Sequence, residues 1–350
     1  MNENLSKHLI HKGASVRDAL KRLNELSSDA ILFVTDDIGA LLGSLTDGDL
    51  RRGFINGLDF DSSIMEFVQD DPKFIVDKEV NLNLLDEYKN RNFKIIPILT
   101  KSGIIKDILN FRIQSSLIPV DAIMMAGGEG KRLRPLTENT PKPLLKVGDK
   151  PIIEHNIDRL KYFGIKRINI SINYLGDQLI QHFGDGTDRN LIINYVKEKK
   201  PLGTIGSVKL IKEFDYEDVF VMNSDVLTNI DYLDFYRTFK ESNADMAVAA
   251  ISYDVNIPYA VLEVGSSNEV KSLKEKPKYT YYSNAGIYFI KKELLQLIPD
   301  DSFYDITDLM DQVIIRGLKL IAYPINGYWL DIGKHEDFKR AQEDINHIKF

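Results

Sequence analysis

From residue 120 onward, short apolar segments alternate with amphipathic ones, and no other feature limits the fold of this chain so strongly. Apolar runs of strand length occupy residues 120–126, 167–174, 218–222 and 246–251. Apolar residues recur at helical spacing over 151–163 and 231–242. This order predicts an α/β fold, in which a mainly parallel, Rossmann-like sheet is flanked by helices on both faces. Ligands of such sheets bind beyond the carboxyl ends of the strands.

An internal repeat occupies the first third of the chain. A shift of 64 positions places Val16 on Val80 and the apolar run 30–34 on 94–98. We expect each copy to form an amphipathic helix, a short apolar strand and a turn with Gly. The two copies diverge after that turn, so the second half of each is expected to differ.

The pattern Gly43-x-x-Thr46-x-x-Asp49 follows the first copy and is missing from the second. A tandem repeat with this ending resembles a pair of CBS modules, an α+β unit that would cover residues 1–115. The resemblance implies that Thr46 and Asp49 hold the ribose of an adenine nucleotide such as AMP or ATP, and that the chain forms a homo-oligomer. The same two residues also fit a helix start, with Thr46 as its cap and Asp49 in the first turn, where the helix dipole favours an acid.

Length and composition limit the classes of protein to which the chain can belong. A chain of 350 residues suggests two or three domains, which we expect at 1–115 and 120–350 with a linker over 116–119. The net charge of −7 disfavours general binding to nucleic acid. The absence of cysteine excludes disulfides and fits a cytoplasmic protein. Because no run of about 18 apolar residues occurs, we expect no membrane span.

The apolar run 120–126 leads directly into the loop Gly127-Gly-Glu-Gly-Lys-Arg132, which is rich in glycine and positive charge. Glycine permits positive φ angles and close approach of the backbone, and successive N–H groups in such a loop form an anion-binding nest. With Lys131, Arg132 and the later Lys142, the loop predicts a cradle for a triphosphate. It lacks the ending of a Walker A loop and the spacing of the dinucleotide fingerprint.

Pro135, Thr137 and the segment Pro141-Lys-Pro-Leu144 follow this loop, and together they resemble the signature of sugar-1-phosphate nucleotidyltransferases. The resemblance extends over about residues 120–350, because further segments typical of the family follow in its order. These are Leu202-Gly-Thr-Ile-Gly-Ser207, Phe220-Val-Met-Asn-Ser-Asp225, Lys274-Glu-Lys-Pro277, Asn284-Ala-Gly-Ile-Tyr288 and Trp329-Leu-Asp-Ile-Gly333. Two positions depart from the usual pattern: Ser224 stands where most members have Gly, and Lys334-His335 where the usual continuation is Thr-Pro.

The resemblance assigns four side chains to catalysis. Asp225 and Asp331, each at the end of an apolar segment, would bind Mg²⁺, for which oxygen ligands are suited. Arg132 would contact the leaving pyrophosphate. Lys142 would contact the α-phosphate and the sugar phosphate.

The resemblance also implies two groups of substrate-binding residues. The nucleotide would be held by the glycine-rich loop and by the segment that borders the nucleobase, at Ala126, Gly127, Gly128, Gly130, Lys131, Gly203 and Thr204. The sugar and its phosphate would be held at Glu275, Lys276, Asn284 and Gly286. The charged run 197–200 is expected to be a solvated loop, although its position before Leu202 would also let it flank the nucleotide.

The implied reaction joins a nucleoside triphosphate and a sugar 1-phosphate into a nucleotide sugar and releases pyrophosphate. The Leu-Gly-Thr-x-Gly segment and the short C-terminus resemble the guanylyl-transferring branch, and fusion to a CBS pair resembles enzymes that form GDP-amino sugars. We therefore expect GTP with glucosamine or N-acetylglucosamine 1-phosphate. Guanylyl transfer to mannose or heptose 1-phosphate, and uridylyl, cytidylyl or thymidylyl transfer, are the alternatives. A different class, an adenine-nucleotide sensor with an inactive transferase core, is opposed by the intact Arg132, Lys142, Asp225 and Asp331.

Overall fold

The structure of the chain is a computed structural model, and it describes residues 3–348. It divides into two compact units. The first runs to Pro119 and also includes Tyr162–Gly164, and the second comprises Val120–Lys161 together with the chain from Ile165 onward. Within the described residues, no helix has both the length and the apolar character needed to cross a membrane.

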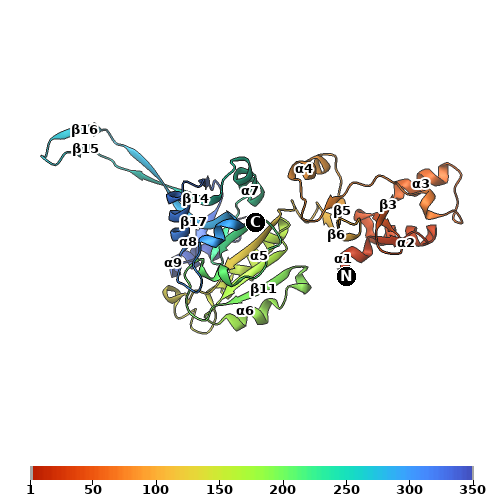
Figure 1. Ribbon diagram of the computed structural model, residues 1–350, viewed down its shortest axis with the longest axis horizontal. Helices are drawn as coiled ribbons and strands as arrows, with labels where there is room; N and C mark the ends of the chain where they lie inside the picture. Colours follow the sequence, from red (N-terminus) through yellow and green to blue (C-terminus); the bar gives the residue numbers. More distant parts are fainter. Residues whose placement is uncertain (1–2, 349–350) are drawn as a thin grey trace. The chain divides into compact units, whose positions relative to one another are not determined.

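The first unit contains two three-stranded sheets of the same topology (Figure 1). Their strands are, in order, β1 (Leu9–His11), β2 (Ile31–Thr35) and β3 (Leu41–Thr46) in one sheet, and β4 (Ile75–Val76), β5 (Ile95–Leu99) and β6 (Ile105–Asn110) in the other. In both sheets the first pair of strands is parallel and the second is antiparallel. The register is irregular after Val34 in β2 and after Ile98 in β5, at positions that the sequence repeat superposes. The repeat in the sequence is therefore also a repeat in the structure.

Four helices accompany these sheets: α1 (Glu3–Lys7), α2 (Val16–Leu26), α3 (Asp47–Ile55) and α4 (Leu82–Asn90). Side-chain caps begin α2 and α4, where Ser15 and Asn81 accept hydrogen bonds from backbone N–H groups of the first turn. The apolar residues of α2 recur at helical spacing and are buried under the first sheet. Only the first copy continues into a helix after its last strand, namely α3.

A seven-stranded sheet forms the centre of the second unit, in the order β11-β10-β7-β12-β17-β14-β18. Its strands are β7 (Val120–Met125), β10 (Arg167–Ile172), β11 (Ile192–Lys197), β12 (Asp218–Asn223), β14 (Met246–Asn256), β17 (Lys278–Lys291) and β18 (Leu320–Pro324). Neighbouring strands are parallel except at β17, which runs antiparallel to both β12 and β14. The predicted α/β fold with a mainly parallel sheet is confirmed.

Helices cover both faces of this sheet. They are α5 (Ile152–Tyr162), α6 (Gly176–Phe183), α7 (Tyr232–Glu241) and α8 (Ile306–Ile315), whereas α9 (His335–Asp344) packs against the short strands β8 and β19. On one face, Val221 and Ile290 belong to the same buried cluster as Leu309 of α8. Because neighbouring side chains of a strand point to opposite faces, Phe289 lies on the other face, where its ring centre is 4.8 Å from that of Phe235 in α7.

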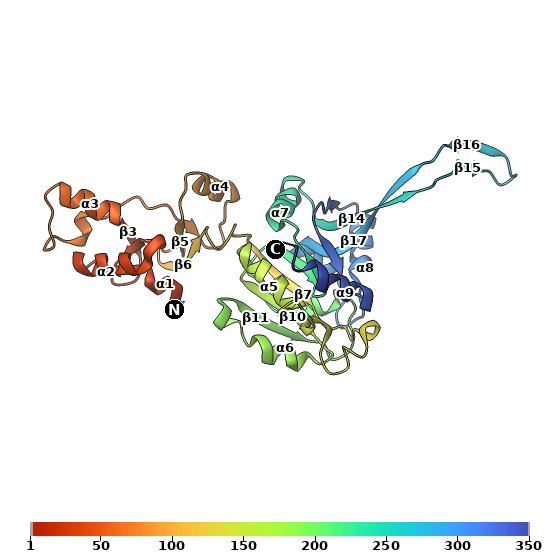
Figure 2. The same ribbon diagram turned by 180° about the vertical axis from the view of Figure 1, so that it is seen from behind.

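β14 and β17 continue beyond the sheet as a two-stranded ribbon, which Figures 1 and 2 show projecting from the second unit. Their pairing extends from Ala250 with Asn284 to Asn256 with Lys278. β15 (Val261–Val264) and β16 (Val270–Lys274) form the end of the ribbon. The strand predicted at 246–251 is thus five residues longer than its apolar run, because β17 keeps pairing with it outside the sheet. We call residues 252–283 the arm.

Two short antiparallel pairs complete the second unit: β8 (Lys146–Val147) with β9 (Lys150–Pro151), and β13 (Val226–Thr228) with β19 (Trp329–Asp331). Leu133, Leu227 and Leu330 pack into one buried cluster. This cluster holds together three segments that are distant in sequence, namely the end of the glycine-rich loop, β13 and β19.

Candidate active site

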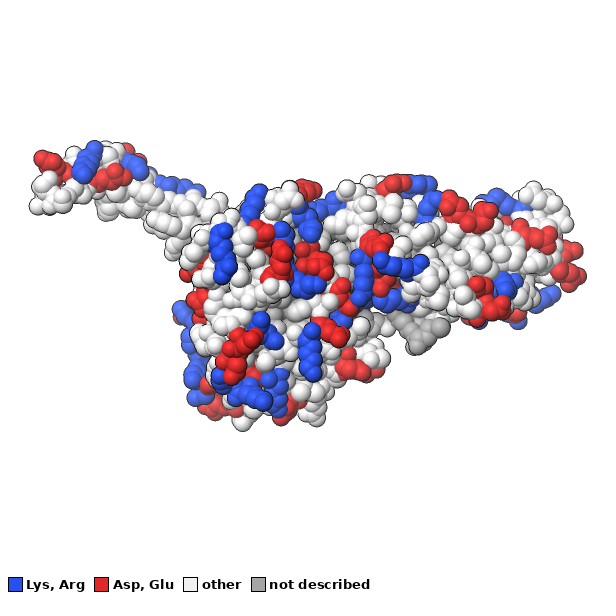
Figure 3. Space-filling view, viewed as in Figure 1, with Lys and Arg blue, Asp and Glu red and all other residues white. Residues whose placement is uncertain are grey.

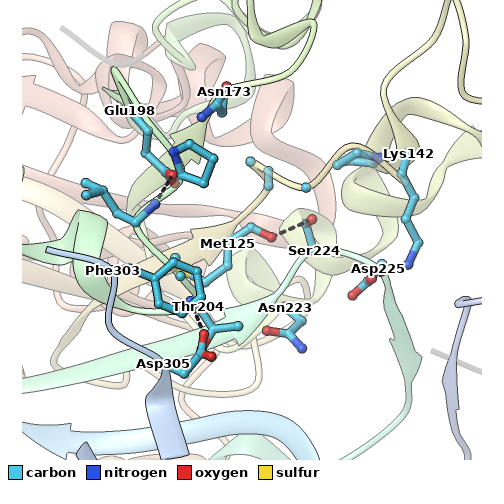
Figure 4. Close-up of a pocket in the computed structure, with 17 residues that line it drawn as sticks. Met125, Lys142, Asn173, Glu198, Thr204, Asn223, Ser224, Asp225, Phe303 and Asp305 are labelled. Atoms are coloured by element: carbon cyan, nitrogen blue, oxygen red, sulfur yellow. Dashed lines mark hydrogen bonds and ion pairs between the residues drawn. The ribbon is translucent and has the colours of Figure 1, made fainter. Parts of the chain in front are cut away.

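A cavity of about 390 Å³ opens at the carboxyl ends of β7 and β12, where Met125 and Asn223 end their strands (Figure 4). The glycine-rich loop, the segment 201–204 and the residues after β12 line it, together with Phe303 and Asp305. Ligands bind at this edge of open α/β sheets. The cavity therefore lies where the strand order predicts a ligand site.

The glycine-rich loop needs glycine at two of its positions. A Cβ on Gly127 would lie 2.9 Å from Oε1 of Glu198, and one on Gly130 would lie 2.9 Å from Cγ2 of Thr137. Gly130 also has a φ of 61°, in the left-handed region that glycine adopts most easily. The hydroxyl of Thr137 donates to the carbonyl of Gly130 at 2.9 Å and secures this conformation.

The predicted phosphate cradle is partly formed by backbone groups. The N–H of Ala126 donates to the carbonyl of Ser171 and is already used by the fold. Within residues 3–348, the N–H groups of Gly127 and Gly128 have no hydrogen-bond partner, and both residues line the cavity. These two groups can therefore donate to an anion.

Lys142 connects the two predicted metal-binding carboxylates. Its Nζ forms an ion pair with Asp225 and lies 3.9 Å from Oδ1 of Asp331. The pairing of β13 with β19 places Val226 opposite Asp331, and the N–H of Ile332 donates to the carbonyl of Asp225 at 3.1 Å. Figure 4 shows Lys142 reaching toward Asp225 at the cavity wall.

The electrostatics of this centre favour an additional cation. Burial raises the pKa of Asp331, and the negative charge of Asp225 raises it further, whereas Lys142 and Arg132 oppose the shift. Arg132 is exposed, and its guanidinium lies beside Gly333, just after Asp331. Two carboxylates that repel each other and already attract two basic side chains can hold a hard cation through oxygen.

Few other groups could bind a metal. Among the residues that the structure describes, no cluster of three or more His, Cys, Asp or Glu side chains is arranged to hold an ion. Asp225 and Asp331 are thus the donors this site offers. Mg²⁺ is commonly held by one or two carboxylates with water and substrate phosphates completing its shell, and the pair fits that chemistry.

Gly203 and Thr204, of the segment predicted to border the nucleobase, line the same cavity. Gly203 has a φ of 77°, and a Cβ there would lie 2.6 Å from the carbonyl oxygen of Tyr304. Thr204 does not cap the segment that follows it. Its hydroxyl instead accepts from the N–H of Ile306 at 2.7 Å and so caps α8, about 100 residues away in sequence.

Glu198 lies in the charged run 197–200, for which the sequence left two alternatives, a solvated loop or a segment that flanks the nucleotide, without singling out this residue. Glu198 is 91% buried, and its carboxylate accepts from Ser171 Oγ at 2.5 Å and from the N–H of Leu202 at 3.1 Å. Figure 4 shows it at the cavity opposite Asp305. The position of the run just before Leu202 was the available signal.

Three further lining residues, Asn173, Phe303 and Asp305, had no local signal at all. Asp305 is held there by a contact distant in sequence, since it accepts hydrogen bonds from both the N–H and the hydroxyl of Thr204, at 2.9 and 3.1 Å. Such contacts do not follow from any short motif.

Asn284 and Gly286 lie at the base of the arm, beside the cavity. Gly286 has a φ of 72°, and a Cβ there would lie 2.6 Å from Nδ2 of Asn223, which lines the cavity. The side-chain oxygen of Asn284 accepts from the N–H of Gly286 and from the hydroxyl of Tyr288. Burial raises the pKa of Tyr288 to about 12, so this hydroxyl remains a donor.

Glu275 and Lys276 lie apart from the other predicted residues. Both are exposed between β16 and β17, and neither lines the cavity. Lys276 stands eight positions before Asn284, and the chain is extended from Lys278 onward, so the two lie at most roughly 26 Å apart at 3.3 Å per residue. The structure does not bring this pair to the cavity of its own chain.

Thr46 and Asp49 form a reciprocal cap at the start of α3. The Thr46 hydroxyl accepts from the N–H of Asp49, and the Asp49 carboxylate accepts from the N–H of Thr46 at 2.8 Å. Asp49 is buried and also pairs with Arg52. Thr46 and Asp49 were interpreted either as a nucleotide site or as a helix cap, and the structure contains the helix cap.

Most of the second unit is similar in sequence to one known protein family. Residues 121–347 match the family model described as nucleotidyl transferase. The chain is 33% identical over 231 residues to the bifunctional protein GlmU of Methanococcus maripaludis, covering 63% of this chain and 53% of that protein. It is 30% identical over 234 residues to a mannose-1-phosphate guanylyltransferase of Mycobacterium tuberculosis, covering 65% and 64%. The chain thus spans about half to two thirds of the length of these relatives.

Two solved structures share the fold. A putative glucose-1-phosphate thymidylyltransferase from Bacillus anthracis, in complex with a sucrose, has a TM-score of 0.53 and 26% identity, covering 66% of this chain and 97% of that chain. HddC from Yersinia pseudotuberculosis, complexed with GMP-PN, has a TM-score of 0.50 and 25% identity, covering 65% and 99%.

Proposed function

Because this chain belongs to the nucleotidyl transferase family, we propose that it transfers a nucleotidyl group from a nucleoside triphosphate to a sugar 1-phosphate and releases pyrophosphate. The observation that carries this proposal is the position of Lys142 between Asp225 and Asp331. A fixed positive charge and two carboxylates at the mouth of a glycine-rich loop suit the joining of two polyanions.

The reaction needs little beyond positioning and charge neutralisation. An oxygen of the sugar phosphate attacks the α-phosphorus, the bond from that phosphorus to the bridging oxygen of the β-phosphate breaks, and pyrophosphate leaves. Because the nucleophile is already an anion, no general base is required. The N–H groups of Gly127 and Gly128 would hold the phosphates, Arg132 the leaving pyrophosphate, and Lys142 the α-phosphate as its charge develops.

Asp225 and Asp331 would hold Mg²⁺, which when bound would offset the negative charge of the phosphates. Before substrate arrives, Lys142 is held at the same carboxylates, so its amino group is already beside the position of the reacting phosphate. Such preorganisation avoids reorienting a charge during the reaction.

The buried carboxylate of Glu198 supports GTP as the nucleotide. Guanine presents two adjacent donors, N1–H and the N2 amino group. Because Oε1 of Glu198 already accepts from Ser171 and Oε2 from Leu202, these donors would use the remaining lone pair of each oxygen. Uracil and thymine present a single ring N–H on that edge. A buried site that expects two donors discriminates against a base that lacks one, because a polar group is then left unpaired. For the sugar we propose glucosamine or N-acetylglucosamine 1-phosphate, with mannose and heptose 1-phosphates as the competing acceptors.

The repeat in the first unit supports a CBS pair with AMP or ATP at Thr46 and Asp49. Both residues already satisfy each other in the cap of α3, so a nucleotide would have to donate to their remaining lone pairs. Calorimetric titration with AMP and ATP tests this site independently of the transfer reaction.

A pyrophosphate-release assay tests the proposed function. Purified protein and Mg²⁺ are combined with GTP, UTP, CTP, dTTP or ATP and with hexose, hexosamine or heptose 1-phosphates. We expect release with GTP and a hexosamine phosphate, its loss in Asp225→Asn, and its retention in Asp158→Asn, where the exposed acid pairs only with Lys150. Silence across all pairings, with thermal stabilisation by AMP or ATP alone, would instead support the sensor.

A further inference from the structure

The arm is an amphipathic ribbon with an uncovered apolar face. Tyr253 pairs with Tyr281 and Val255 with Tyr279 across the two strands, so these four side chains share one face. Asp254 lies on the opposite face, where it bonds to Lys278 at 2.7 Å and to Thr280 at 2.8 Å. An isolated two-stranded ribbon is at best marginally stable in water. The apolar face therefore needs a partner surface.

The amount of exposed apolar surface matches one side of a stable interface. Apart from Tyr282, which lies on the face of Asp254, seven apolar side chains of the arm are 48–75% exposed, namely Tyr253, Tyr259, Leu262, Val264, Val270, Leu273 and Tyr281. Burying them would remove on the order of 700 Å² per copy, close to the roughly 800 Å² that each partner contributes to a standard interface.

The charge of the arm suits an identical partner. Residues 252–283 carry four lysines and four acidic residues, so their formal charges cancel. Figure 3 shows these charges interspersed along the arm rather than gathered by sign. Two copies of such a surface meet without net repulsion, whereas a strongly charged partner would gain little electrostatic attraction from it. Pairing of like patches is the rule in two-fold dimers.

We infer that two copies of this chain exchange arms, and that each arm delivers Glu275 and Lys276 to the active site of the other copy. When two identical ribbons pack antiparallel about a two-fold axis, a residue outward of the axis on one copy meets a residue the same distance inward on the other. Lys276 lies between β16 and β17, inward of the β15–β16 end of the arm. The midpoint between Lys276 and Asn284 falls at residue 280, next to the Tyr253–Tyr281 pair. An axis there would bring Lys276 to the partner's Asn284, beside the partner's cavity.

This arrangement accounts for two observations that a single copy leaves without a reason. Lys276 of the Glu275-Lys276 motif lies up to roughly 26 Å along the arm from Asn284, at 3.3 Å per residue. Lys276 also has a φ of 43°, an uncommon backbone conformation for a residue other than glycine and one that is often found at functional sites.

A single introduced thiol tests the exchange, because the chain has no cysteine of its own. Tyr281→Cys places a thiol near the expected axis, and Ser252→Cys places one on the opposite face of the same ribbon. Under mild oxidation we expect Tyr281→Cys to form a covalent dimer of twice the 40.0 kDa chain mass, and Ser252→Cys to remain monomeric on a denaturing gel. Contact through the first unit alone, or folding of the arm onto its own chain, would leave Tyr281→Cys uncrosslinked and overturn the inference.

Mixing two inactive variants tests the delivery of Lys276, and this part rests on the proposed function. Lys276→Ala and Asp225→Asn are refolded or coexpressed together. In a mixed dimer with exchanged arms, one site combines an intact Asp225 with the partner's intact Lys276, so roughly a quarter of the wild-type rate returns. With arms used by their own chain, both sites of the mixed dimer stay defective and nothing returns.

The two readouts separate the possible failures. An inactive wild-type protein that still crosslinks at Tyr281→Cys would refute the proposed function and keep the exchanged arms. An active wild-type protein that crosslinks but shows no rescue would refute the delivery of Lys276. Absence of both crosslink and rescue in an active enzyme would refute the exchange itself.

Discussion

The Nζ of Lys142 forms an ion pair with the carboxylate of Asp225, although 83 residues separate the two along the chain. Both side chains are largely buried at the cavity, and Asp331 lies on the other side of the amino group. This contact joins the positively charged end of the loop region to the acidic end of β12. It is the part of the site on which the proposed chemistry depends most.

Replacing Lys142 should therefore stop turnover. We expect Lys142→Met to lower kcat by about 10²–10³, the usual effect of removing one preorganised charge from a transition state. Lys150→Met is the matched control, because its ion pair with Asp158 is exposed and such pairs contribute little. A Lys142→Met enzyme with near-normal kcat would show that this charge does not act on the reacting phosphate.

Asp331→Asn should raise stability while it removes activity. The pKa of Asp331 is raised in the folded protein, mainly by burial and then by Asp225, so its ionised form opposes folding. The folded state then binds more protons than the unfolded state, and the free energy of unfolding falls as pH rises from the ordinary carboxyl pKa through the raised one.

Thermal unfolding from about pH 3.5 to 7 checks whether stability falls with rising pH in this way. Without Mg²⁺, we expect the variant to lose less stability than the wild type over that range and to melt at a higher temperature at pH 7. Asp158→Asn should follow the wild type. A lower melting temperature for Asp331→Asn at pH 7 would contradict the assigned burial and repulsion.

Two glycines of the same loop should respond differently to alanine. At Gly130 a Cβ would press on Thr137 and Lys142, and the positive φ adds strain, so we expect Gly130→Ala to destabilise by roughly 1–3 kcal/mol and to reduce activity. At Gly128 a Cβ would meet nothing within 4 Å, so Gly128→Ala should keep its melting temperature. Equal melting temperatures for the two variants would disprove this account.

Glu198→Gln should lower the activity with GTP more than the activity with the other nucleotides. The amide keeps the shape but can accept only at one atom, so we expect kcat/KM for GTP to fall by about 10- to 100-fold relative to UTP. Lys199→Gln, at the exposed neighbouring position, is the control. An equal loss with all nucleotides would assign Glu198 to support of the loop rather than to base recognition.

Thr46→Ala should destabilise the first unit by about 1 kcal/mol, since it removes the cap of α3. Urea unfolding followed by hydrogen exchange in residues 47–55 locates the effect. If Thr46→Ala also abolished AMP or ATP binding while Thr46→Ser restored both, the cap and a nucleotide site would share this hydroxyl.

Much of the second unit could be predicted because its determinants are local. Apolar runs of strand length set where β7, β10 and β12 form, because these strands are buried on both faces, and helical spacing sets α5 and α7. The glycines of the loop and the carboxylate after β12 were recognisable for the same reason, since a turn or strand end constrains residue type within a few positions.

Contacts between distant segments could not be predicted in this way. The amphipathic pattern of the arm is present in the sequence, but the length of the ribbon depends on β17 continuing to pair with β14. Glu198 lies in a charged run, and only its hydrogen bonds to Ser171 and Leu202 make it a buried cavity residue.

The sequence by itself determined the α/β class, the repeat and the order of the chemical motifs, because these depend on spacing along the chain. Only the tertiary structure decided that Lys142, Asp225 and Asp331 meet, and that Glu275 and Lys276 lie apart from them. The reason is physical: backbone geometry imposes local periodicity, whereas the pairing of β13 with β19 depends on burial and hydrogen bonding between segments about 100 residues apart. The path of the arm depends on the pairing of β14 with β17.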